Sequence, residues 1–160
     1  MEVEKTLKRA EVFLGLDDND LNKIASLNSC REKSYQPGEL IFQAGDEAKY
    51  LYILKEGQVH LLMDILTTSK KEKVLVDRIT TGAFFGWTAL VRPHFYVMSA
   101  ICEKPSTVVL IGGTELIALF DKDNYIGYKV FQSLSHVIGT RLRDIEQLLV
   151  KGQRWPFLDR

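Results

Sequence analysis

The stretch FFGWTALVRPHFYVMSA, residues 84–100, decides how the rest of the chain is interpreted. Gly86 stands between aromatic residues, a short helix-forming segment follows it, and an Arg-Pro turn leads into a run of β-forming residues. Glycine adopts backbone conformations that other residues avoid, and it lets another group approach the main chain closely. The stretch therefore predicts a sharp turn against which something packs.

Patterns typical of β-strands surround this turn over residues 30–112. Short runs of β-forming residues are separated by turns, and the runs are ELIFQ, YLYILK, QVHLLMDIL, VLVDRI, YVMSAI and STVVLI. The expected turns lie at Pro37-Gly38, Gly45-Asp46, Glu56-Gly57, the charged tip at 69–73, Gly82, Gly86 and Gly112-Gly113. No intervening segment is long enough for the helix of a parallel crossover, so the sheets are expected to be antiparallel. Short strands at regular spacing predict a sandwich or barrel.

Helical patterns occupy both ends of the chain. In residues 1–29, Asp17 or Asp18 is expected to cap a helix, because a short carboxylate accepts hydrogen bonds from the free backbone N–H groups of a first turn. In residues 113–150, a short capped helix is predicted to start at Thr114. It is followed by a much longer helix.

The long helix is predicted over about residues 124–150, and it leaves residues 151–160 as a tail. Its length of about 27 residues corresponds to roughly 40 Å, about the width of a globule of this size. One apolar stripe follows the helix at spacings of three and four residues, and its members are Phe131, Leu134, Ile138, Leu142, Ile145 and Leu149. We expect part of the stripe to cover the β-core and the rest to form a homodimer interface. The alternative is a helix that lies wholly on its own core.

Length and composition limit the class of protein. The 160 residues suit one domain, the hydrophobic content of 46% supports a core, and 21 basic residues balance 21 acidic ones. This charge balance gives no general grip on DNA or on an anionic membrane. Cys30 and Cys102 are too few for a disulfide framework and are expected to be reduced thiols. No apolar run approaches the length of a membrane span and the N-terminus lacks a signal peptide's apolar segment, so the expected location is the cytoplasm.

The predicted elements follow the order helix, glycine-punctuated strands, short helix and long helix, and four short motifs occur within this order. The motifs are Phe13-Leu-Gly-Leu, Gly38-Glu-Leu-Ile-Phe before Gly45-Asp46, Leu51-Tyr-Ile-Leu before Gly57, and Phe85-Gly86 before Ala89-Leu90. Together they resemble the cyclic-nucleotide-binding domain family, over about residues 10–150. The resemblance implies an α+β fold in a single domain over residues 1–160. An antiparallel β jelly roll (double-stranded β-helix) is flanked by an N-terminal helix, a short helix and a long C-terminal helix.

In that family the counterpart of the opening stretch is the phosphate-binding cassette, in which a glycine and a short helix present backbone N–H groups to the cyclic phosphate. The resemblance implies a ligand site made of Phe85, Gly86, Trp87, Thr88, Ala89, Leu90, Arg92, Tyr96, Val97 and Ser99. On the long helix, the polar residues at the height where family members contact the purine are Ser133, Ser135, His136 and Thr140.

Two family anchors are missing from this cassette. Trp87 stands where the family has a glutamate for the ribose hydroxyl, and an indole accepts no hydrogen bond. The position of the phosphate-binding arginine falls on Phe95 or Tyr96, which carry no charge. Losing two hydrogen bonds to charged groups costs about 3–6 kcal/mol, on the order of 10²–10⁴ in affinity. Arg92 is the best substitute for the phosphate partner, and its alternative role is an exposed turn residue.

The aromatic residues around Trp87 leave two interpretations open: a pocket remodelled for a flat or apolar ligand, or rings that fill the former nucleotide space. The first predicts a non-enzymatic, ligand-sensing regulatory module. It would bind cAMP or cGMP weakly, or another small ligand, and signal through the long helix. The second predicts a protein-interaction or scaffold subunit with an occluded pocket.

Other activities lack sequence support. The chain shows no catalytic or metal-binding motif, which argues against an enzyme. The ten residues after the long helix, KGQRWPFLDR, are too few for a helix-turn-helix, so direct DNA binding is not expected, although a piece of a longer protein would give the same sequence. The balanced charge and the lack of a membrane-spanning apolar run give no reason to expect a membrane partner.

Overall fold

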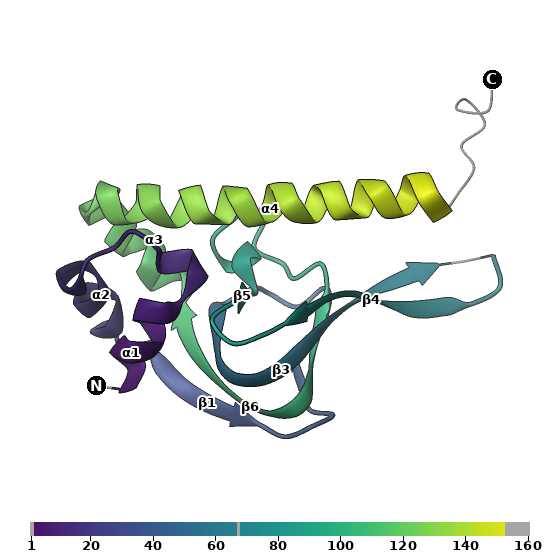
Figure 1. Cartoon of the computed structure of the whole chain (residues 1–160), viewed down its shortest axis with the longest axis horizontal. Helices are drawn as coiled ribbons and strands as arrows, with labels where there is room; N and C mark the ends of the chain where they lie inside the picture. Colours follow the sequence, from purple (N-terminus) through teal and green to yellow (C-terminus); the bar gives the residue numbers. More distant parts are fainter. Residues whose placement is uncertain (1, 67, 153–160) are drawn as a thin grey trace.

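A long helix lies across a roll of β-strands and a group of shorter helices. The computed structural model describes residues 2–66 and 68–152. The long helix α4 (Asn124–Gly152) covers the short helices with its first half, and its second half extends over the roll and part of a projecting hairpin (Figure 1). Residues 151 and 152 of the predicted tail belong to α4, and the remainder of the tail lies outside the described residues.

The N-terminal region forms α1 (Glu2–Arg9), the 3₁₀ turn η1 (Glu11–Phe13) and α2 (Asp18–Ala25). The predicted cap of α2 is confirmed at Asp17: its carboxylate accepts from Asp20 N at 2.8 Å, and the Asp20 carboxylate accepts from Asp17 N at 3.2 Å. The short helix α3 (Gly113–Lys122) begins one residue before Thr114, and no side chain caps it. None of the helices in the described ranges combines the length and hydropathy of a membrane span.

Six strands form one antiparallel sheet that curls without closing, which confirms the predicted jelly-roll class. They are β1 (Arg31–Tyr35), β2 (Leu40–Phe42), β3 (Tyr50–Leu66), β4 (Lys71–Ile79), β5 (Phe84–Phe85) and β6 (Ser99–Gly112). The order is β1-β6-β3-β4, with β2 also paired to β6 and β5 to β3. The sequence prediction missed β1, because its segment REKSY is mostly charged and exposed.

One expected turn, Glu56-Gly57, is wrong, and two pairs of predicted strand segments each form a single strand. YLYILK and QVHLLMDIL form the single strand β3, and STVVLI continues β6 from the end of YVMSAI. Gly57 marks an irregularity within β3 rather than a hairpin turn. Its φ is 107°, and a Cβ there would lie 2.6 Å from Pro105 O on the paired strand. The glycine thus reflects close packing of two long bent strands.

Strand β3 has apolar residues on both faces, and they belong to two different cores. Leu51 and Ile53 pack towards the helices, whereas Tyr52 and Leu54 face the interior of the roll. The helical core also contains the buried residues Leu7, Ile24, Leu116, Ile126, Val130 and Leu134. The roll interior combines aliphatic side chains with the rings of Tyr35, Phe42, Tyr52, Phe85 and Tyr96. The turn at Gly86 lies at the edge of this second core.

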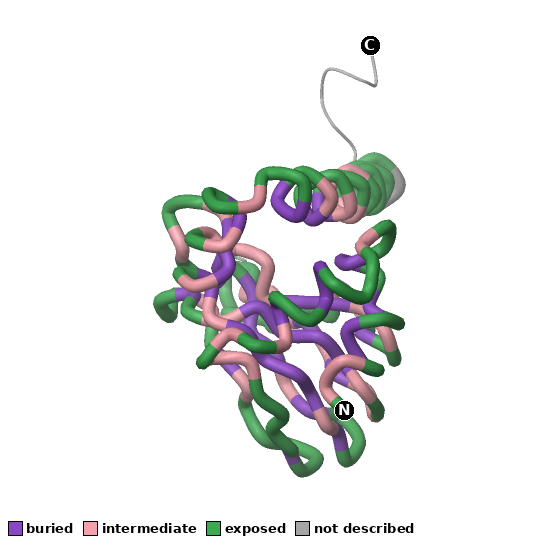
Figure 2. Tube along the Cα trace, turned by 90° about the vertical axis from the view of Figure 1, so that its left-hand side faces the viewer, coloured by how far each residue is buried: buried purple, intermediate pink, exposed green. Residues whose placement is uncertain are grey.

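Only part of the predicted dimer stripe is available to a second copy. Leu134 is 1% exposed and packs in the helical core, so its side chain is not accessible to a second copy in this conformation. Phe131 packs edge-on against Phe120 and is partly exposed. Ile138 and Ile145 are partly buried, whereas Leu142 and Leu149 are exposed. Figure 2 shows the same trend: buried residues on the near turns of α4 give way to exposed ones on its far turns.

Candidate functional site

The glycine turn has the geometry that its sequence predicts. Gly86 has φ 73° and ψ 25°, in the left-handed region, and it precedes the one-turn helix η2 (Trp87–Ala89). A Cβ at this position would lie 3.0 Å from both Tyr50 O and Tyr52 Cδ2. Both the backbone conformation and the lack of space therefore require glycine here. The turn is closed by hydrogen bonds from Ala89 N to Gly86 O and from Leu90 N to Trp87 O.

Tyr96, not Phe95, faces the site. Phe95 is 51% exposed, whereas Tyr96 is 5% exposed and stacks on Phe42 with ring centroids 3.6 Å apart. The Tyr96 hydroxyl donates to Tyr50 O at 2.7 Å and accepts from Tyr50 N at 3.3 Å. Burial raises the pKa of Tyr96 to about 12, so the phenol stays neutral. It therefore supplies packing where a phosphate site needs positive charge.

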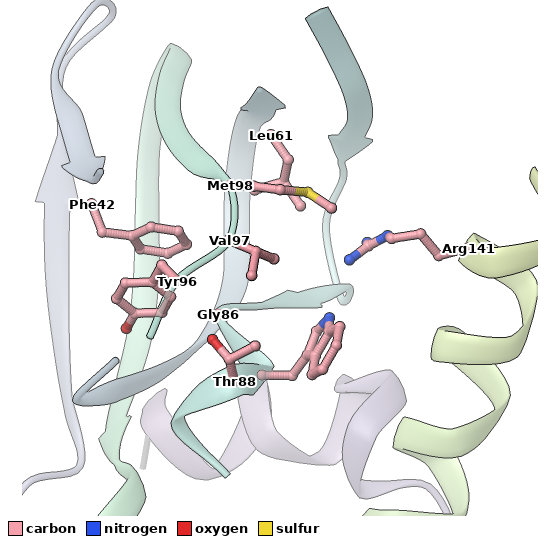
Figure 3. A pocket seen from close by; sticks show the side chains of 9 residues that line it. Phe42, Leu61, Gly86, Thr88, Tyr96, Val97, Met98 and Arg141 are labelled. Atoms are coloured by element: carbon pink, nitrogen blue, oxygen red, sulfur yellow. The ribbon is translucent and has the colours of Figure 1, made fainter. Parts of the chain in front are cut away.

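Further rings fill the interior behind Tyr96. Tyr52 stacks on Phe85 with centroids 5.0 Å apart, and Phe42 lies 5.6 Å from Tyr52. Burial raises the pKa of Tyr52 well above its usual value, which also keeps this phenol neutral. In Figure 3, Phe42 and Tyr96 lie face to face on one side of the remaining space.

We call this remaining space the aromatic hollow; its lining is Phe42, Leu61, Gly86, Trp87, Thr88, Tyr96, Val97, Met98 and Arg141. Its volume of about 30 Å³ is room for one or two water molecules. Ligand pockets usually measure roughly 300–1,000 Å³. The conformation described here is therefore nearly filled with side chains, and a ligand requires that some of them move.

The structure brings together half of the predicted ligand residues. Gly86, Trp87, Thr88, Tyr96 and Val97 line the hollow. The other five do not, and the reasons are physical: Phe85, Ala89 and Leu90 are buried in the two cores, Arg92 is exposed on its turn, and Ser99 Oγ accepts from Ala44 N at 3.0 Å. The proposed substitute Arg92 therefore does not supply the phosphate partner in this conformation.

Four residues that line the hollow were not predicted from the sequence, and Arg141 is the charged one among them; the others are Phe42, Leu61 and Met98. Arg141 projects from α4 towards the hollow (Figure 3). Its side chain is only 11% exposed, and Arg141 Nη2 donates to Asp77 Oδ2 of β4 at 2.8 Å. A signal existed in the sequence: Val130, Leu134 and Val137 form the inner face of α4, and the next position at helical spacing is Arg141. A charge that interrupts an apolar face marks a place where the face meets something polar.

A wider groove runs beside the hollow, between α4 and the strands β4 and β5. Its volume is about 280 Å³, and Arg141 lines both spaces. His136 and Thr140 line this groove rather than the hollow, and Thr140 Oγ1 donates to His136 O within the helix. Ser135 is exposed and Ser133 half-buried. The described residues contain no group of His, Cys, Asp and Glu that could hold a metal ion.

Comparison with known proteins gives consistent matches. The family model of the cyclic nucleotide-binding domain matches residues 32–123. The type II regulatory subunit of the cAMP-dependent protein kinase of Drosophila melanogaster is 28% identical over 123 residues, which cover 74% of this chain and 28% of that protein. The chain spans a third or less of the length of the curated relatives it matches.

Solved structures show the same fold at low sequence identity. A cyclic nucleotide-binding domain from Methylobacillus flagellatus KT superposes with a TM-score of 0.81 at 16% identity, and the match covers 96% of this chain and 87% of that one. The Thermus thermophilus catabolite activator protein superposes with a TM-score of 0.72 at 21% identity, covering 88% of this chain and 62% of that one.

Proposed function

This chain belongs to the cyclic nucleotide-binding domain family, a family of regulatory domains, and on that premise we propose that it is a ligand-sensing regulatory module. It binds a cyclic nucleotide weakly, or a different small ligand, in the aromatic hollow, and its output is the second half of α4. One observation carries this proposal: Arg141 of α4 forms part of the wall of the hollow. A ligand that changes the hollow must therefore change the surroundings of the helix.

The weakness of nucleotide binding follows from the residues of the cassette. The glutamate and arginine positions hold a tryptophan and a tyrosine, and each lost hydrogen bond to a charged group costs about 1.5–3 kcal/mol. Binding must also displace side chains from a cavity of about 30 Å³. Both effects weaken a cyclic nucleotide relative to a family member that keeps the two anchors.

The output of α4 is proposed to be contact with a second copy. Leu142 and Leu149 are exposed, and with the partly exposed Phe131 they retain the helical spacing of a two-helix interface. A homodimer that pairs these turns would cover apolar residues that the chain itself leaves open.

A thermal unfolding series with cAMP, cGMP and adenosine, the last as an uncharged control, tests ligand binding. We expect no shift of the unfolding temperature at micromolar concentrations of cyclic nucleotide and a shift at millimolar concentrations. A ligand stabilises the folded chain appreciably only when its concentration exceeds its dissociation constant, and the gain is about 2.7 kcal/mol at 100 times that constant. The variant Trp87→Glu with Val97→Arg should bind cAMP on the order of 10²–10⁴ times more tightly, as measured by calorimetry.

Position 97 suits the arginine better than position 96. Val97 is exposed and lines the hollow, whereas Tyr96→Arg would bury a guanidinium beside Phe42 and remove both hydrogen bonds to Tyr50. The matched variant Trp87→Glu with Tyr96→Arg should therefore lose stability. If the folded double variant, Trp87→Glu with Val97→Arg, still does not bind cAMP at millimolar concentration, the proposal is contradicted.

The rings in the hollow favour a second candidate function, a protein-interaction subunit with a non-binding pocket. It predicts no thermal shift with any small ligand. It also predicts that Leu142→Glu abolishes self-association while the unfolding temperature of the isolated chain is unchanged.

A further inference from the structure

We propose that Arg141 is the anion-binding residue of the aromatic hollow and that Asp77 is an internal competitor for its guanidinium, an inference that rests on the proposed function. The ligand class is a small molecule with one anionic group on a flat or apolar body. A cyclic nucleotide, through its phosphodiester, and an aromatic acid, through its carboxylate, share this chemistry.

The lining of the hollow singles out Arg141. Among the described residues that line it, Arg141 alone carries a charge; the others are apolar or neutral. A guanidinium presents two parallel N–H donors to a phosphate or carboxylate, which gives a stronger contact than a neutral donor does. The charge reaches the hollow from α4, so it replaces the missing cassette arginine from a different element of the fold.

The acidic residues near Arg141 lie on its other side. Glu11, Asp77 and Asp144 line the groove between α4 and β4, together with the cation Arg78, and none of them lines the hollow. Carboxylates repel an anion in the groove, whereas no carboxylate opposes one in the hollow. An anionic group is therefore expected to approach Arg141 from the side of Trp87 and Met98.

The ion pair with Asp77 is suited to competition. Arg141 is 11% exposed but Asp77 is 42% exposed, so water already screens one partner, and such pairs contribute little to stability. An anion at the hollow would lie against mostly apolar walls, where the dielectric is lower than in bulk water and the attraction to the guanidinium is stronger. Arg141 also borders both spaces, so its movement would join the hollow of about 30 Å³ to the groove of about 280 Å³. The joined space approaches the smallest ligand pockets, about 300 Å³.

Capture of Arg141 by a ligand would break the ion pair that joins α4 to β4. The two halves of one ion pair then have opposite effects on ligand binding. Asp77→Asn removes the competitor and should tighten binding of an anionic probe about two- to fivefold. Arg141→Gln removes the anion's partner and should weaken binding about tenfold or more. Arg141→Lys keeps the charge but loses the two-donor geometry, so its loss should be smaller.

The experiment is calorimetric titration of the full chain and these variants with cAMP, with indole-3-acetate and with inorganic phosphate. Indole-3-acetamide and adenosine serve as uncharged analogues, and their binding should not change between variants. The pair Lys23–Asp123, at 2.9 Å and remote from the hollow, supplies the matched control: Lys23→Gln and Asp123→Asn should leave probe binding unchanged. Urea unfolding of each variant separates loss of folding from loss of binding.

The inference is supported if Asp77→Asn tightens and Arg141→Gln weakens the binding of anionic probes, and neither variant changes the binding of the uncharged analogues. It is overturned if both variants change the affinity for anionic probes in the same direction, or if Arg141→Gln does not change it. It is also overturned if no anionic probe binds to the Asp77→Asn variant. Binding of indole-3-acetate through Arg141 without binding of cAMP keeps the inference and excludes a cyclic nucleotide as the ligand. Binding of cAMP that is insensitive to Arg141→Gln keeps the proposed function and removes Arg141 from it.

Discussion

The two halves of α4 form one continuous helix, yet they stand in different environments. In the first half, Ile126, Val130 and Leu134 are fully buried against the short helices. In the second half, Leu142 is 54% exposed, Leu149 and Val150 are also exposed, and a groove of about 280 Å³ separates the helix from the strands. The second half is also richer in charged residues and poorer in apolar ones, so the two halves differ both in sequence and in the elements that cover them.

This difference separates a structural half, which packs in the helical core, from a more exposed half. The first half cannot shift without opening the helical core, which would expose fully buried side chains. The second half meets the roll through the Arg141–Asp77 ion pair and the walls of the groove. A movement there costs little packing, which is the property that an output element needs.

The largest expected effect breaks the structural half. Leu134→Ala should lower the free energy of unfolding by about 2–5 kcal/mol, because it leaves a cavity at a fully buried position. The matched variant Leu142→Ala should change that free energy by less than about 0.5 kcal/mol, because the side chain is exposed. Urea unfolding at low protein concentration measures both. Equal losses would show that the second half is as firmly packed as the first.

A pair of glycines gives a smaller effect with opposite signs. Gly127→Ala would place a Cβ 2.8 Å from Phe120 Cβ, so overpacking of about 1–3 kcal/mol should exceed the gain in helix propensity. Gly139→Ala meets nothing within 4 Å and should stabilise the helix by about 0.5–1 kcal/mol. Thermal unfolding compares the two. Destabilisation by Gly139→Ala in a dimer, but not in a dilute monomer, would indicate that a second helix approaches closely there.

The smallest effect is a pH dependence at the start of the structural half. A hydrogen bond from Lys23 holds the pKa of Asp123 below its usual value of 3.8. A lowered native pKa means that the stabilisation is complete above about pH 4 and is lost as the pH falls through the native value. Wild type should therefore be slightly more stable than Asp123→Asn at pH 7, and the gap should close in acid. If the difference in stability between wild type and Asp123→Asn persists at pH 2, Asp123 stabilises the fold without its charge.

Local signals in the sequence predicted most of the fold. The Asp17 cap, the positive φ of Gly86 and the long helix depend on residues close together in the chain, and each was found where it was expected. The turn predicted at Glu56-Gly57 was wrong, because a glycine within a bent strand and a glycine in a hairpin look alike in sequence.

The candidate site was only half predictable, and for a physical reason. The glycine turn, the family and the replacement of the two polar anchors by rings can be read from residues close together in the chain. The packing of distant elements is what holds Tyr96 in the hollow through its hydrogen bonds to Tyr50, and what brings Arg141 to the hollow from a helix while it is paired with Asp77. These partners lie 46 and 64 residues apart in the chain. Side-chain contacts over such separations depend on how strands and helices pack: the helical spacing places Arg141 on the inner face of α4, but it does not identify Asp77 or the hollow as what Arg141 meets there.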